Sequence, residues 1–188
     1  MASKGTLGQI NTIGLPLVRS HPAETFFNPQ ETVASLLSEF IPRLPGHILV
    51  LPPKAPVNTY ALMNIADVGL VYASTTGMEM TMRGVPVICG IKSHYNGKGF
   101  TSDPVTQEDY FTCIDRVLQN PHGHRLTPRQ VELAWCYADM FFNEWIRPFP
   151  WVSGHKLWRD LKAWPMARIL SQEGEERFGK TFDVLLGL

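Results

Sequence analysis

The first half of this chain alternates between short apolar runs and segments with helical apolar spacing. The runs predict four buried strands, over Ile13–Val18, His47–Leu51, Val68–Tyr72 and Val85–Cys89. The spaced segments predict helices between these strands, over Pro29–Ile41, from Asn58 to Ile65, and around Glu79 up to Gly84. Strands joined by helices favour parallel pairing, because parallel strands need crossover connections. We therefore predict an α/β core, a Rossmann-like parallel sheet flanked by helices, over about residues 12–105.

The second half of the chain has helical spacing and no strong strand pattern. Thr106–Gln119 carries apolar residues on one face, and Thr127–Gln130 matches a capping box with proline at the first helical position. Two prolines in Arg147–Pro150 predict a break, and the spacing over Gly154–Ile169 predicts a last amphipathic helix. We expect this helical extension, about residues 106–188, to pack on the sheet within a single domain over residues 1–188.

A cluster of small polar residues follows the third predicted strand. Ser74, Thr75 and Thr76 come first, and Gly77 and Glu79 follow at the start of a short helix. Parallel sheets bind ligands at the carboxyl edge, where a helix N-terminus offers amide donors and a positive dipole end to a phosphate. A carboxylate there suits the hydroxyls of a ribose. The pattern predicts a nucleotide or nucleotide-sugar site; the alternative is an ordinary N-cap at Ser74, with Glu79 as a partner of the helix dipole.

Two further segments belong to the same predicted edge. His21 follows the first predicted strand, with Arg19 just before it, and would contact a phosphate or a base there. Its alternative role is to cap a turn. The loop Ile91–Asp103 carries Tyr95 and Lys98, which suit contacts with a sugar or phosphate, since its glycines permit close backbone approach. A plain surface connection is the alternative for this loop.

Charge and hydropathy exclude several function classes. The 188 residues carry 17 basic and 17 acidic side chains without a block of like charge, which argues against a nucleic-acid partner. No apolar run approaches the roughly 20 residues of a transmembrane segment, and Met1–Ile10 lacks the apolar core of a secretory signal. Cys89, Cys113 and Cys136 are widely spaced, which favours buried reduced thiols in a cytoplasmic protein.

Metal binding is not predicted. His122 and His124 lie two positions apart in a predicted loop, and no cysteine or acidic ligand lies near them in the sequence. That spacing favours a solvated turn over a metal site. We therefore expect neither a metal nor a cofactor.

Five segments, taken in order, resemble the capsule polysaccharide biosynthesis family. They read V-R-S-H-P-A-E, V-N-T-Y-A-L-M-N-I-A-D-V, A-S-T-T-G-M-E-M-T-M-R-G-V-P-V-I, Y-N-G-K-G-F-T and Q-E-D-Y-F, and they span about Pro16–Phe111. That family comprises bacterial GT-B-type glycosyltransferases of surface-polysaccharide assembly, including transferases of Kdo (3-deoxy-D-manno-octulosonic acid). The resemblance implies a C-terminal, donor-binding domain of this type.

The resemblance also implies roles for the polar residues. His21, Ser74, Thr75 and Thr76 would contact the nucleotide and its phosphate, and Glu79 would bind the ribose hydroxyls of a CMP- or UDP-linked sugar. No catalytic residue is assigned. GT-B enzymes contain two Rossmann-like domains and this chain has room for one, so we expect a separate acceptor-binding domain or subunit and little transfer by the chain alone. A peripheral association with a membrane is compatible with this role.

Two other functions fit the same pattern. Non-hydrolysing nucleotide-sugar 2-epimerases share the GT-B architecture, so the chain also fits one half of such an enzyme. A non-catalytic binding or assembly module that retains the fold is the third interpretation.

Overall fold

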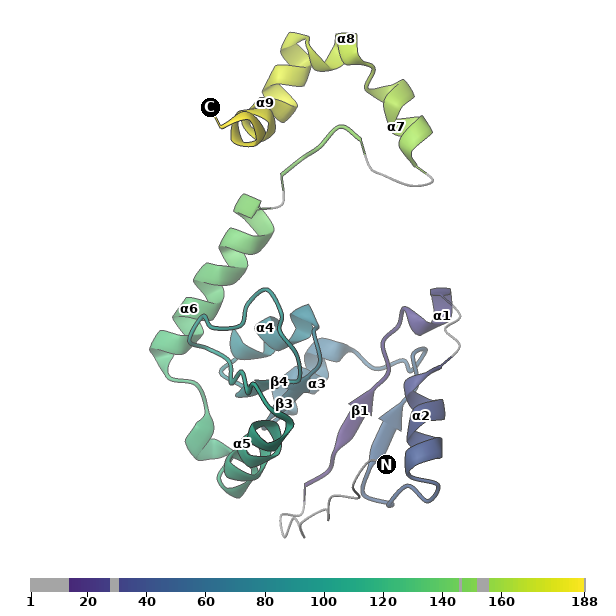
Figure 1. Cartoon of the computed structure of the whole chain (residues 1–188), viewed down its shortest axis with the longest axis vertical. Helices are drawn as coiled ribbons and strands as arrows, with labels where there is room; N and C mark the ends of the chain where they lie inside the picture. The colour runs from purple at the N-terminus through teal and green to yellow at the C-terminus, as the bar shows by residue number, and fades with distance from the viewer. Residues whose placement is uncertain (1–13, 28–30, 146, 152–155, 188) are drawn as a thin grey trace. The chain divides into compact units, whose positions relative to one another are not determined.

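The computed structural model describes residues 14–27, 31–145, 147–151 and 156–187. The chain divides into two compact units, Met1–Val131 and Glu132–Leu188. The described residues form a mixed α/β fold, with two parallel two-stranded sheets in the first unit and helices in the second (Figure 1). The predicted α/β class and the parallel pairing are confirmed. No strand pairing joins the two sheets among the described residues.

The first sheet pairs β1 (Leu17–Arg19) with β2 (Leu49–Leu51) in parallel. The connection between them contains α1 (Glu24–Phe27) and α2 (Val33–Phe40). The sequence pattern predicts α2 but not α1, which is a single turn of helix. Thr32 sets the start of α2 because its side chain caps the helix, whereas the predicted start at Pro29 lies outside the described residues.

The second sheet pairs β3 (Gly69–Val71) with β4 (Val87–Cys89), also in parallel. Three helices surround this pair in the sequence: α3 (Thr59–Ile65), α4 (Thr75–Thr81) and α5 (Gln107–Gln119). Side chains of Asn58, Ser74 and Thr106 cap their starts, as small polar residues do at helix N-termini. After α4, Gly84 adopts a φ of 76°, which favours glycine, and the chain turns into β4.

Alternate residues of β3 and β4 face two different helices, because successive side chains of a strand point to opposite faces. Ile88 packs with Cys113 and Val117 of α5. On the other face, a Cβ added at Gly69 would lie 2.7 Å from the Met80 sulfur of α4, so the missing side chain of Gly69 admits this helix. β4 is therefore covered on both faces and buried along its whole length, whereas Leu70 of β3 is 54% exposed.

Each strand in the described part of the chain is three residues long, shorter than the apolar run that predicts it. β1 and β4 each begin directly after a proline, Pro16 and Pro86, which has no amide to donate to a neighbouring strand. β2 begins after a turn in which the Ile48 amide donates to the Pro45 carbonyl at 3.0 Å. The predicted start of the first strand at Ile13 lies outside the described residues.

The rest of the described chain is helical. It contains η1 (His122–His124), α6 (Pro128–Asp139), the π-helical turn η2 (Met140–Trp145), α7 (Leu157–Ala163), α8 (Met166–Ile169) and α9 (Gln172–Leu186). The predicted capping box at the start of α6 is present, since the Thr127 amide donates to the Gln130 side-chain oxygen at 3.0 Å.

Two predictions for the second unit are wrong. The helix predicted over Gly154–Ile169 is interrupted by Pro165, which lacks an amide and disfavours helical geometry at the residue before it. The sequence pattern also missed α9. Gly174 and Gly179 lower its helix propensity, yet an added Cβ at Gly174 would lie 2.6 Å from Ile169 Cα, so this glycine allows α9 to pack against α8.

Candidate functional site

Ser74 begins α4 immediately after β3, at the carboxyl edge of the second sheet. Its hydroxyl accepts from the Thr76 amide at 3.2 Å and donates to the Thr76 hydroxyl at 2.9 Å. Thr75 is exposed, and its hydroxyl makes no hydrogen bond with the residues that the structure describes. The cap that the sequence allowed as an alternative is therefore present. Among the described residues the Thr75 hydroxyl makes no hydrogen bond and the Thr76 hydroxyl only accepts one, so both can donate to a ligand.

Glu79 lies in the second turn of α4 beside Tyr60 of α3. The nearby Glu79 carboxylate raises the pKa of the Tyr60 hydroxyl, because a proton on that hydroxyl is favoured beside a negative charge. Arg83 lies over the Tyr60 ring at 5.2 Å and donates to the Glu79 carbonyl at 2.8 Å. Tyr60 itself is 52% exposed. The result is a surface cluster of a carboxylate, an aromatic ring and a guanidinium next to the hydroxyl turn.

The sequence pattern does not single out Tyr60 as a site residue. The sequence indicates only where Tyr60 lies on its helix: Asn58 predicts the helix start and places Tyr60 in the first turn. Its contact with Glu79 depends on how α3 packs beside α4, and no sequence spacing reports that.

Tyr95 holds the backbone of the hydroxyl turn in place. It is completely buried, and its hydroxyl donates to the Ser74 carbonyl at 2.6 Å. Its ring lies against Gly77, where an added Cβ would collide with the Tyr95 hydroxyl and approach Val71 Cγ2 to 2.9 Å. Burial, with smaller contributions from neighbours including Cys89, raises the pKa of Tyr95 to about 12. Gly77 and Tyr95 thus have packing roles in the turn, and Lys98 of the same loop is exposed.

The loop that carries Tyr95 is held in place by hydrogen bonds. The Gly97 amide and the Thr101 hydroxyl both donate to the Asp103 carboxylate, at 2.7 Å each. Ser102 then bridges to β4, since its amide donates to the Val87 carbonyl at 2.9 Å and its carbonyl accepts from the Cys89 amide at 3.0 Å. The loop is an ordered part of the unit that fixes the position of the Ser74 turn.

His21 lies at the end of β1, where it is exposed. Its Nδ1 accepts from the Ala23 amide at 3.0 Å, which is the turn-capping geometry that the sequence allowed as an alternative. Arg19 donates to the Pro52 carbonyl at 3.3 Å. Between them, Ser20 is fully buried with no hydrogen-bond partner for its hydroxyl among the described residues. No hydrogen bond joins these residues to the Ser74 turn in the described structure, so their convergence on one cleft remains a prediction.

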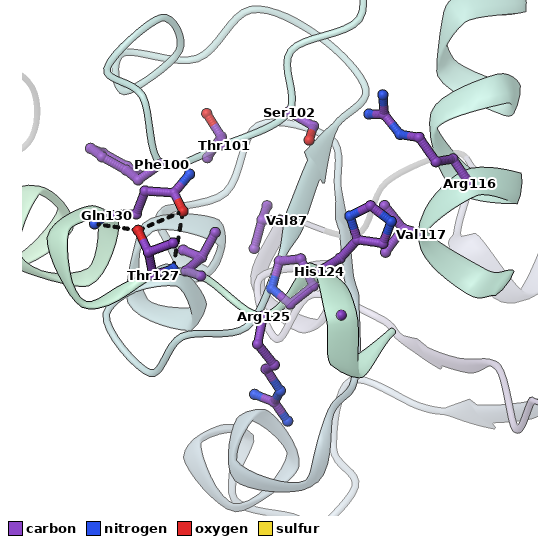
Figure 2. Close-up of a pocket in the computed structure, with 13 residues that line it drawn as sticks. Val87, Phe100, Thr101, Ser102, Arg116, Val117, His124, Arg125, Thr127 and Gln130 are labelled. Carbon is purple, nitrogen blue, oxygen red and sulfur yellow. Dashed lines mark hydrogen bonds between the residues drawn. The ribbon is translucent and has the colours of Figure 1, made fainter. Parts of the chain in front are cut away.

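A cavity of about 270 Å³ lies at the opposite, amino edge of the second sheet, around Pro86 and Val87. Figure 2 shows Ser102, His124 and Arg116 along one side of it, and Phe100, Thr127 and Gln130 along the other. A second cavity of about 350 Å³ adjoins it and shares Ser102 and Arg116. The sequence analysis predicted neither, because they are formed by segments that no single motif contains.

The cysteines and histidines form no metal centre in the described part of the chain, where no group of three or more metal-ligating side chains comes together. Cys89 and Cys113 are buried, as expected, whereas Cys136 is exposed. Burial, with a smaller effect of Asp103, raises the pKa of Cys89 to about 11 and keeps its thiol protonated at neutral pH. None of the described helices has the length and apolar character needed to cross a membrane.

Comparison of the chain with protein-family models, with curated proteins and with solved structures finds no match.

Proposed function

We propose that this chain binds a nucleotide sugar at the carboxyl edge of its parallel strands, as the donor-binding part of a glycosyltransferase of surface-polysaccharide assembly. The proposal includes a Rossmann-like arrangement in which both parallel strand pairs contribute to one site. One observation carries it: β3, α4 and β4 form a parallel unit whose hydroxyl turn begins at the carboxyl end of β3. Open parallel sheets bind nucleotides at this edge.

Each group at the turn has a defined task in this proposal. The Thr75 hydroxyl donates to a phosphate oxygen, since Ser74 is used as the cap. Glu79 accepts hydrogen bonds from the ribose hydroxyls, and the exposed Tyr60 ring lies beside the nucleoside. Hydrogen bonds to a charged group are stronger than neutral ones, so the carboxylate of Glu79 contributes more to affinity than an amide in its place.

A titration of the purified chain with CMP-, UDP- and GDP-linked sugars tests the proposal. Glu79→Gln should weaken binding of the preferred nucleotide sugar by about tenfold or more, because bonds to a charged group contribute about 1.5–3 kcal/mol each. The melting temperature should change little, because glutamine retains the side-chain length and has nearly the same helix propensity as glutamate. Calorimetry measures the affinity, and thermal unfolding measures the stability of the same variant.

Glu39→Gln is the matched control, since Glu39 is exposed on α2 and loses the same charge. Equal affinities of Glu79→Gln and the unaltered chain would remove Glu79 from the site. Absence of binding for every nucleotide sugar in the panel would overturn the proposed function.

A further inference from the structure

The formally charged side chains that line the cavity at the amino edge of the second sheet are basic. Its lining contains Arg116, Arg125 and His124 and no carboxylate. Arg125 is already engaged, because it donates to the Ala66 carbonyl at 3.2 Å and lies 4.0 Å from Asp67. Figure 2 shows its guanidinium pointing away from the cavity. Arg116 is therefore the charged group of the lining that remains for a ligand, and His124 adds an imidazole.

Arg116 has no strong partner within the described structure. Its contact with protein is a 3.4 Å approach of Nη2 to the Cys113 sulfur, which is a weak acceptor, and it forms no ion pair with a described residue. A guanidinium carries five donors in a planar fork that matches the oxygens of a phosphate or carboxylate. Arg116 is exposed at the wall of this cavity, whose own lining contains no acidic group, and it also lines the adjoining cavity, which contains Asp103 and Asp109. Because it pairs with neither aspartate, its donors remain open to an anion.

Ser102 and His124 add donors on the same side of the cavity. Neither side chain makes a hydrogen bond with a described residue, yet both backbones are fixed. Ser102 is held on β4 by hydrogen bonds to Val87 and Cys89, and the His124 amide donates to the Pro121 carbonyl at 3.1 Å. The two side chains are thus presented from rigid positions, which lowers the entropic cost of binding a ligand.

The polar groups on the other side of the cavity are already paired. Gln130 donates to the Gly99 carbonyl at 3.1 Å and accepts from the Thr127 amide and hydroxyl. The Thr101 hydroxyl donates to Asp103. The apolar side chains of Val87 and Phe100 also line the cavity and are almost completely buried. The cavity thus combines three free donor groups with an apolar wall.

We propose that this cavity is a second ligand site, which binds a small phosphate monoester. Its phosphate oxygens accept from Arg116, Ser102 and His124, and its carbon skeleton lies against Val87 and Phe100. A phosphate monoester presents three terminal oxygens to three donor groups, whereas a carboxylate presents two. The volume of about 270 Å³ lies just below the usual range of ligand pockets, which favours a ligand smaller than a nucleotide sugar.

Titration of the full chain with inorganic phosphate and with glycerol 3-phosphate, at constant ionic strength, tests this site. Both should bind and should shift the backbone amide NMR signals of Ser102 and His124, while glycerol should not. Arg116→Gln should weaken glycerol 3-phosphate binding by about tenfold or more. Ser102→Ala should weaken it less, because a neutral hydroxyl forms the weaker bond. Thermal unfolding verifies that both variants remain folded.

Arg43→Gln is the matched control, because Arg43 is exposed in the first unit and does not line the cavity. It should leave the affinity for glycerol 3-phosphate unchanged. Equal weakening by Arg43→Gln and Arg116→Gln would reduce the effect to net charge and overturn the proposal. Acetate binding as tightly as inorganic phosphate would overturn the assignment to a phosphate.

This site and the nucleotide-sugar site are separable by experiment. Arg116→Gln should leave nucleotide-sugar affinity intact, and Glu79→Gln should leave glycerol 3-phosphate affinity intact. Failure of nucleotide-sugar binding alone would leave the phosphate site standing. Displacement of glycerol 3-phosphate from the cavity by a nucleotide sugar, seen at the Ser102 and His124 signals, would contradict the second site.

Discussion

At the residue scale, the contact between Gly77 and Tyr95 fixes the geometry of the hydroxyl turn. Tyr95 comes from the loop after β4, yet its hydroxyl binds the Ser74 carbonyl and its ring occupies the space beside Gly77. A side chain at position 77 would displace that ring. The glycine in the turn is therefore explained by protein packing, independently of any ligand.

Gly77→Ala should destabilise the chain by about 1–2 kcal/mol. Overpacking a filled site costs about 1–3 kcal/mol, and the higher helix propensity of alanine returns up to about 1 kcal/mol. Urea unfolding measures the difference. Gly46→Ala is the control, because an added Cβ there meets nothing within 4 Å. A Gly77→Ala variant as stable as the unaltered chain would show that the Tyr95 ring does not fill this space.

At the element scale, capping side chains determine where most of the longer helices of the first unit begin. Thr32, Thr106 and Thr127 each form a reciprocal capping box, and these motifs are readable from local sequence. α6 depends on its cap in a further way, because Gln130 of the same box also donates to the Gly99 carbonyl of the long loop. The cap thus links the start of α6 to the loop that carries Tyr95.

Thr127→Ala should lower the free energy of unfolding by about 1 kcal/mol, the usual cost of removing an N-cap side chain. The variant leaves the Gln130 side chain without the Thr127 hydroxyl as a partner. Denaturant unfolding followed by circular dichroism gives the change. Thr112→Ala, at an exposed position inside α5, should be neutral or slightly stabilising because alanine favours helix. Equal effects of the two substitutions would argue against the cap.

At the scale of the whole molecule, the first unit contains the strands and both candidate ligand sites, and the second unit is helical. The second unit is held by its own contacts: Trp164 packs edge-on against Phe178 at 4.8 Å, and Arg168 lies over the Trp164 ring at 4.2 Å. Arg168 also binds Glu173 at 2.6 Å and lowers the pKa of that carboxyl. In the described part of the chain, strands occur in the first unit and not in the second.

Under the proposed function, the purified 188-residue chain should bind a nucleotide sugar weakly and transfer little sugar. A donor site without a closing acceptor-binding domain lacks the exclusion of water and the positioning that domain closure provides. A transfer assay with the preferred nucleotide sugar and candidate acceptors measures this, and adding a separate acceptor-binding protein should raise the rate. Robust transfer by the chain alone would contradict the expectation.

Local sequence determined the approximate positions of the strands and of several helix starts, because these depend on residues close together in the chain. The apolar runs located four strands, and small polar residues located the starts of α3, α4 and α6, because strand burial and helix capping act over a few positions. The strand ends were less accurate, since Pro16 and Pro86 limit pairing in a way that an apolar run does not reveal.

Tertiary structure decided what depends on residues far apart in the chain. It alone pairs Glu79 with Tyr60, buries Tyr95 under the Ser74 turn, and brings Ser102, Arg116 and His124 around one cavity. It also admits α9, whose Gly174 argues against a helix locally but packs closely against α8. The physical reason is common to all four: packing between distant segments selects small residues and joins polar ones, and local propensity does not contain that information.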